Sequence, residues 1–226
     1  MKKITIFVVA IAMTMLTISG CSKKKEETPQ TQPGQTEQVQ VPKNQKTIDN
    51  LKAAIKGETT ANAKYTAFAK KASEEGYTKI AKLFEAIAHA ESIHINNHKE
   101  VLANITKEPY VITPDSFTVG TTEENLADAI KGETYESTTM YPEFLEQAKT
   151  DNEQGAVTSF DYALQTEKKH KQMYENALQM LKDKKEKTMV STYYICPKCG
   201  YTYLPNELTA SCIVCATPKE KFIVFK

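Results

Sequence analysis

Apolar residues recur every three or four positions along four long segments of the chain, which is the period of an amphipathic α-helix. The pattern predicts helices at 47–76, 77–105, 121–152 and 156–185. Residues 107–120 hold two prolines and are too many for a tight turn between adjacent antiparallel helices, so they predict a crossover connection. The four helices are therefore expected to form an all-α four-helix bundle over residues 47–187.

Local signals indicate where these helices begin, bend and end. Thr121 and Glu124 have the spacing of a capping box, which opens a helix. Pro142 lies inside the third helix, where its missing N–H predicts a kink, and Asn152 tolerates the left-handed geometry of a helix C-cap. Residues 188–226 change to Val, Tyr, Ile, Cys, Pro and Gly. Such a segment is too small for a core of its own, so it predicts a metal-stapled β/loop domain.

The amino terminus, residues 1–20, has the form of an export signal, with two lysines before an apolar run too short to span a bilayer. Ile18-Ser19-Gly20-Cys21 resembles the lipobox of bacterial lipoproteins, which implies lipidation of Cys21. An ordinary cleaved signal with a chance cysteine is the alternative. Residues 21–46 contain no aromatic residue and are expected to be a flexible linker. We therefore expect an extracytoplasmic lipoprotein held at a membrane.

Bulk composition changes this picture little. The chain has 226 residues, of which 40% are hydrophobic and 25% charged, as in an ordinary soluble protein. Its formal net charge is +1 and no basic face is clustered, so nucleic acid is not expected as a partner.

Two stretches of the chain repeat each other, Leu51 to Thr59 and Leu126 to Thr134, and each contains Gly-Glu. Each is followed by a Glu-x-x-His on the next helix. The spacing from Glu58 to Glu91 is 33 residues and that from Glu133 to Glu167 is 34, so the duplication covers a helix pair. The candidate metal ligands from the two copies are Glu58, Glu91, His94, Glu133, Glu167 and His170.

These six residues lie on the same stripes as the apolar residues, and residues three apart share a helix face. Buried carboxylates are strongly destabilising unless they are protonated or neutralised by metal. One Glu from each of two helices and a Glu-x-x-His from each of the other two is the ligand set of di-iron carboxylate bundles. Carboxylate and imidazole ligands suit iron or manganese. The alternative is that all six are ordinary helix residues, but that interpretation must also explain why the same pattern occurs twice in the chain.

Three further residues near the ligands are candidates for the site. Glu136 follows Glu133 at helical spacing and is a possible seventh ligand. Tyr65 and Tyr141 lie one or two turns from Glu58 and Glu136. They are either core aromatics or hydrogen-bond donors to the ligands, and the sequence leaves both interpretations open.

The last 39 residues contain two Cys-x-x-Cys pairs, Cys196 with Cys199 and Cys212 with Cys215. This spacing predicts a tetrahedral four-thiolate site for iron or zinc. Two disulfides are the competing interpretation, because an exported protein meets oxidising conditions. The spacing does not decide between iron and zinc.

Both sites in this order resemble rubrerythrin, in which a ferritin-like di-iron bundle precedes a rubredoxin-like domain. The resemblance covers residues 47–226 and rests on the Gly-Glu, Glu-x-x-His and Cys-x-x-Cys motifs. It implies that Glu91 and Glu167 bridge two irons and that Glu58, Glu133 and His170 are terminal ligands. It further implies that His94 and Glu136 are alternative ligands of one iron, exchanged with its redox state. A third iron is implied in the four-thiolate site.

The resemblance also implies a function. Members of the rubrerythrin family reduce hydrogen peroxide to water, with electrons relayed from the four-thiolate iron to the di-iron site. A donor protein, unidentified here, would bring electrons from NAD(P)H, and a homodimer is implied in which the rubredoxin-like domain of one subunit serves the other's bundle. This chain departs from the family at Cys212-Ile-Val-Cys215-Ala216, which lacks the usual Pro and Gly, and in its export signal.

Two other functions compete with a membrane-tethered peroxidase. One is a ferritin-like ferroxidase or iron-binding protein, which the bundle alone would support. The other is a lipoprotein without enzymatic activity whose four cysteines hold a structural zinc ion.

Overall fold

The structure is a computed structural model that describes residues 43–226. The expected signal segment 1–20, Cys21 and the linker as far as residue 42 lie outside the described residues. Residues 43–226 belong to one compact unit. Within that range, no helix is both long enough and apolar enough to cross a bilayer.

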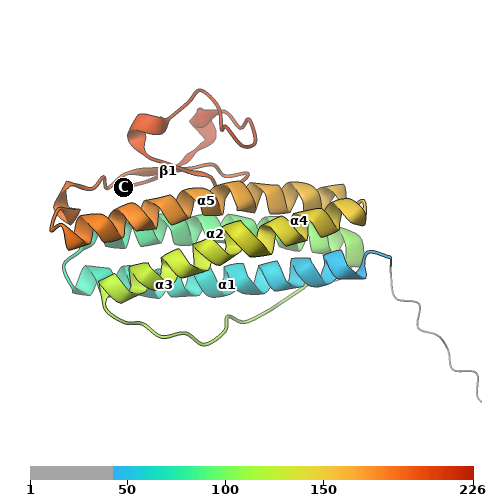
Figure 1. Ribbon diagram of the computed structural model, residues 1–226. Coiled ribbons are helices and arrows are strands. Elements are labelled where there is room, and N and C mark those ends of the chain that lie inside the picture. Colours follow the sequence, from blue (N-terminus) through green and yellow to red (C-terminus); the bar gives the residue numbers. More distant parts are fainter. Residues whose placement is uncertain (1–42) are drawn as a thin grey trace, which may run out of the picture. The chain divides into compact units, whose positions relative to one another are not determined.

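Four long rods lie side by side and form the bundle (Figure 1). They are α1 (Gln45–Glu74), α2 (Thr78–Thr106), the continuous rod of α3 (Thr122–Tyr135), a π-helical segment (Glu136–Met140) and α4 (Tyr141–Thr150), and α5 (Gln154–Lys182). Helix α1 packs along α2, and α3 and α4 pack along α5. The predicted four-helix bundle is confirmed, and the segment between α2 and α3 crosses over as a strap without regular structure.

The helix ends follow the local signals in the sequence. Thr121 and Glu124 form the expected capping box, and Asn152 adopts a left-handed φ of 59° between α4 and α5. Gly76 has a φ of 86° in the turn between α1 and α2, which only glycine adopts readily.

The predicted kink at Pro142 takes another form. Pro142 lies in the first turn of α4, where a missing N–H costs little. The irregularity comes just before it, where the Tyr141 N–H donates to the Glu136 carbonyl, five residues earlier. This wider turn adds one residue to the helix.

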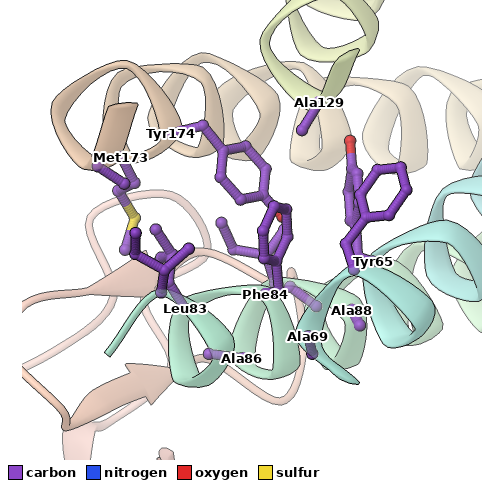
Figure 2. Packing of buried hydrophobic residues seen from close by; sticks show 14 of the residues in the cluster. Tyr65, Ala69, Leu83, Phe84, Ala86, Ala88, Ala129, Met173 and Tyr174 are labelled. Carbon is purple, nitrogen blue, oxygen red and sulfur yellow. The ribbon is translucent and has the colours of Figure 1, made fainter. Parts of the chain in front are cut away.

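Two apolar clusters fill the bundle, one toward each end. The first surrounds Tyr65, Phe84 and Tyr174, which are labelled in Figure 2. The ring centroids of Tyr65 and Tyr174 are 5.3 Å apart, and the rings meet edge to face. The second surrounds Leu51, Phe160 and residues near them. Every long rod contributes to both clusters and changes from one to the other near its middle, which is where its candidate metal ligand lies.

The carboxy-terminal module, residues 188–226, is a three-stranded antiparallel sheet with two metal knuckles, which are the Cys-x-x-Cys loops at 196–199 and 212–215. Its strands are β1 (Tyr193–Ile195), β2 (Thr202–Tyr203) and β3 (Ile223–Phe225), in the order β2-β1-β3. In the register, Tyr194 pairs with Tyr203 on one side and Val224 on the other. Strands of two or three residues form too small a sheet to be stable on its own. The sheet contacts α2 and α5 of the bundle.

Candidate metal centres

The six expected ligands of the bundle all point to one place between the two apolar clusters. Glu58 comes from α1, Glu91 and His94 from α2, Glu133 from α3, and Glu167 and His170 from α5. Each of the six side chains is at most 1% exposed to solvent. The helical period that buries the apolar stripes therefore also buries the ligands.

Their ligand atoms form two overlapping groups. One holds Glu58, Glu91, His94 and Glu167, and the other holds Glu91, Glu133, Glu167 and His170; within each group the atoms lie within 4.8 Å of one another. Glu91 and Glu167 belong to both groups.

The two shared carboxylates each direct one oxygen to each histidine. The His94 Nδ1 atom lies 3.0 Å from Glu91 Oε2 and 2.8 Å from Glu167 Oε1. The His170 Nδ1 atom lies 3.1 Å from Glu91 Oε1 and 2.8 Å from Glu167 Oε2. This is the arrangement of two metal positions bridged by two carboxylates.

The chemistry of the buried atoms fits two divalent or trivalent cations. Six ligand atoms have no hydrogen-bond partner: Glu58 Oε2, both oxygens of Glu91, Glu133 Oε2, Glu167 Oε1 and His94 Nδ1. Unpartnered buried carboxylates are costly unless a cation compensates them.

Without metal, protons must take the place of the cations. Burial, reinforced by neighbouring carboxylates, raises the pKa of Glu58 to about 8 and also raises that of Glu133. Burial alone would lower the pKa of His170, but Glu91 and Glu167 raise it to about 9. Metal binding therefore releases protons from these groups.

Both expected tyrosines are buried and donate hydrogen bonds to ligands, so they are core aromatics and ligand partners at once. The Tyr65 hydroxyl of α1 donates to Glu133 Oε1 of α3 at 2.7 Å. The Tyr141 hydroxyl of α4 donates to Glu58 Oε1 of α1. The two bonds thus cross between the halves of the duplication.

Glu136 lies outside both ligand groups. It begins the π-helical segment and is partly buried. Its Oε1 atom would be 3.7 Å from a Cβ at Gly57, so the carboxylate lies against α1. Burial raises the pKa of Glu136, and Glu58 and Glu167 raise it further, which places the carboxyl near the site without joining either group.

The carboxy-terminal module contacts the outer nitrogen of each histidine. The Cys199 carbonyl accepts from His94 Nε2 at 3.1 Å. Thr202 Oγ1 donates its proton to the Gly200 carbonyl and lies 3.1 Å from His170 Nε2, so it accepts from that nitrogen. Both imidazoles then carry their proton on Nε2 and present the Nδ1 lone pair to the metal positions.

These outer partners have no signal in the sequence, because they depend on how the module packs on the bundle. Gly200 makes the close approach possible. A Cβ at this residue would lie 2.6 Å from His94 Nε2, and its φ is 83°.

The four carboxy-terminal cysteines converge as a second centre. Their sulfur atoms lie within 4.8 Å of one another, and all four cysteines are free. The Cys196–Cys215 and Cys199–Cys212 sulfurs are 3.4 and 3.5 Å apart, far beyond the roughly 2.05 Å of a disulfide bond. The disulfide alternative is therefore wrong, and the set is that of a tetrahedral thiolate site.

The two knuckles differ at the residue that follows the second cysteine. Gly200 and Ala216 occupy equivalent places and both have a left-handed φ, 83° and 59° respectively. The alanine carries a Cβ in a conformation that favours glycine.

Comparison with known proteins matches both parts of this arrangement. The family model described as Rubrerythrin matches residues 49–178. Rubrerythrin-2 of Clostridium acetobutylicum is 37% identical over 81% of this chain and 98% of its own length. Nigerythrin of Nitratidesulfovibrio vulgaris is 37% identical over 79% of this chain and 86% of its own.

Solved structures give the same result. The fully reduced, all-ferrous state of nigerythrin superimposes with a TM-score of 0.73 at 37% identity, over 79% of this chain and 86% of that one. A bacterioferritin from Rhodobacter capsulatus, at 20% identity and a TM-score of 0.57 over 61% of this chain and 86% of that one, shares the fold alone. The fold is thus ferritin-like, the bundle ligand set is a di-iron site, and the four cysteines are a rubredoxin-like iron site.

Proposed function

Because this chain belongs to the rubrerythrin family, we propose that it reduces hydrogen peroxide to water, with electrons passing from its four-thiolate centre to its bundle centre. Membership of the family makes it a di-iron oxidoreductase of oxidative stress defence. The reaction consumes one peroxide, two electrons and two protons and gives two waters. Two irons held by the two bundle ligand groups would supply the two electrons of this reduction.

The hydrogen bond between His94 and Cys199 carries this proposal. His94 belongs to the bundle ligand group and Cys199 to the thiolate group, so one hydrogen bond joins the two centres. Thr166 of α5 donates to the same carbonyl at 3.2 Å, which holds it in place. A ferroxidase that only stores iron has no need of a thiolate centre in contact with its ligand.

The remaining parts of the proposal concern supply and location. We expect a donor protein to bring electrons from NAD(P)H to the four-thiolate centre. We expect Cys21 to anchor the protein outside the cytoplasm, and the chain to form a homodimer. In that dimer, the module of one subunit would make with the partner's bundle the contacts that it makes here within one chain.

The test is rapid mixing of the anaerobically reduced protein with peroxide, preceded by metal analysis. We expect three irons per chain, and oxidation of both centres by peroxide. The Cys212→Ser variant is the matched control, because it should lose the thiolate iron and keep the bundle irons, so that the bundle reacts once and is not reduced again.

Other outcomes would contradict the proposal. A bundle centre that stays reduced in peroxide would exclude the peroxidase. Faster reaction with oxygen and uptake of iron well beyond three ions would favour the ferroxidase. Two irons with one zinc would mean that the metal in the four-thiolate centre only stabilises the fold of the module.

A further inference from the structure

His98 is a polar residue in the apolar half of the bundle around Phe160. Its side chain is fully buried, and its ring lies 5.4 Å from that of Phe160 and 5.8 Å from that of Tyr141. It does not belong to either ligand group. A buried imidazole is costly unless both nitrogens have partners, and both nitrogens of His98 do.

The partners of His98 lead directly to a metal ligand. Its Nδ1 atom lies 2.7 Å from the Ser159 hydroxyl of α5, and its Nε2 atom lies 3.1 Å from the Tyr141 hydroxyl of α4. Tyr141 donates to Glu58 Oε1. One chain of hydrogen bonds therefore runs from α5 through α2 and α4 to the ligand on α1.

The donor and the acceptor of each hydrogen bond in this series follow from Glu58, the metal ligand at one end of it. A carboxylate that binds a metal ion is ionised and only accepts hydrogen bonds, so in the metal-loaded protein the single Tyr141 proton points at Glu58. The Tyr141 oxygen must then accept from His98 Nε2, which carries the one proton of a neutral imidazole. His98 Nδ1 is left as an acceptor for Ser159. Burial, assisted by His94, lowers the pKa of His98 to about 3, which agrees with a neutral ring.

We propose that His98, held by Ser159, is a positioning residue that fixes the Tyr141 proton on Glu58 and thereby weakens Glu58 as a donor to its iron. A hydrogen bond to a ligand carboxylate withdraws electron density from it, and partners of this kind tune the metal. The inference rests on the di-iron site and not on peroxide as the oxidant, so the peroxidase proposal and this one can fail separately.

The other half of the bundle provides an internal comparison. Tyr65 is the counterpart of Tyr141 and donates to Glu133, but its neighbours are the rings of Phe68, Phe84 and Tyr174. Within residues 43–226, no histidine lies behind Tyr65 as His98 lies behind Tyr141. Only the iron held by Glu58 and His94 should therefore respond to changes at His98.

The tautomer of His98 is the direct test. In ¹⁵N-labelled protein with zinc in all metal sites, which is diamagnetic, long-range ¹H–¹⁵N spectra should show His98 neutral and protonated on Nε2 at neutral pH. The signal is assigned by its loss in His98→Gln. A ring protonated on Nδ1 alone, or an imidazolium ion, would overturn the proposal.

Redox titration of the iron-loaded protein gives the second readout. His98→Leu removes the donor to Tyr141, whereas the amide N–H of His98→Gln can occupy the place of Nε2–H. We expect the leucine variant to lower the potential of the Glu58-side iron, with a tenfold change in its ferric preference corresponding to about 59 mV. The glutamine variant should retain most of the potential, and the Glu133-side iron should not change.

Equal potentials in the leucine and glutamine variants would overturn the proposal, as would equal shifts of both irons. If the leucine variant does not fold, Ser159→Ala carries the test. That variant should keep its iron content and helical circular dichroism, and the potential of its Glu58-side iron should fall as in the leucine variant, because the ring is no longer held against Tyr141. An unchanged potential in Ser159→Ala would overturn the proposal.

Discussion

Replacing Thr202 with valine should weaken the metal bound by His170 while leaving the chain folded. Thr202 is fully buried in β2 and joins two groups, because its hydroxyl accepts from His170 Nε2 and donates to the Gly200 carbonyl. Valine has nearly the same shape and the β-branch that strands favour. The substitution therefore removes two hydrogen bonds with little change in packing.

The magnitude follows from what is left unpaired. A buried donor or acceptor without a partner costs about 1–3 kcal/mol, and the valine leaves one of each. Loss of an outer partner of a ligating histidine typically weakens metal binding by about 10–100-fold. We therefore expect metal at His170 to bind at least about tenfold more weakly, which corresponds to about 1.4 kcal/mol.

Anaerobic titration with ferrous iron against a competing chelator measures this change, and Mössbauer spectra separate the two irons. The control is Thr202→Ser, which keeps the hydroxyl and should bind metal as the native protein does. The reasoning is refuted if the valine variant binds both irons normally, or if the serine variant is as weak as the valine one. An equal loss at both irons would mean that the module had separated from the bundle.

Three further predictions concern the knuckles and the metal-free site. Ala216→Gly should stabilise the module by about 1 kcal/mol, because it relieves a left-handed alanine; calorimetry of the iron-loaded protein measures it, and an unchanged transition would contradict it. Gly200→Ala should slow electron transfer from the thiolate centre to the bundle in stopped-flow spectra, because its Cβ would meet His94; a native rate would contradict it. The metal-free protein should lose stability as pH rises from about 4.5 to 9, because folded Glu58 keeps its proton up to a pKa of about 8 and folded His170 up to a pKa of about 9, whereas the unfolded chain loses these protons at lower pH. Thermal melts should show a fall of up to about 1.4 kcal/mol per pH unit for each proton, which the metal-loaded protein lacks.

The six bundle ligands could be predicted from the sequence because helical spacing alone decides which residues share a face. Glu58 and Glu133 repeat within identical Gly-Glu motifs, and each Glu-x-x-His lies on an apolar stripe. The four-thiolate site could be predicted equally well, since each Cys-x-x-Cys pair forms one knuckle and the spacing of the two pairs is typical of a metal site. In each case, neighbours in the chain determine the geometry.

Other parts of the site depend on contacts between distant segments. Thr202 and the Cys199 carbonyl reach the histidines only because the module packs on α2 and α5, and no local pattern encodes that packing. His98 is four residues from His94 and shares its helix face, but a lone histidine in an apolar stripe does not reveal its partners. Ser159 carries no signal at all.

The π-helical segment did leave a signal in the sequence, in the one-residue difference between the two repeat spacings. Tyr65 follows Glu58 by seven residues, whereas Tyr141 follows Glu133 by eight. The distance from each tyrosine to the next Glu-x-x-His is the same, 26 residues. The whole difference therefore falls between Glu133 and Tyr141, where the wide turn lies. A kink attributed to Pro142 missed this because the proline is accommodated at the start of α4.

The extra residue also bears on why both halves of the site lie in one chain. Two identical helical hairpins that paired as separate chains would carry the same turns in both halves. Within residues 43–226, the π-helical segment is present only in the second hairpin, after Glu133. A single chain that holds both hairpins can therefore make its two metal positions unequal, which a symmetric pair of identical hairpins cannot do.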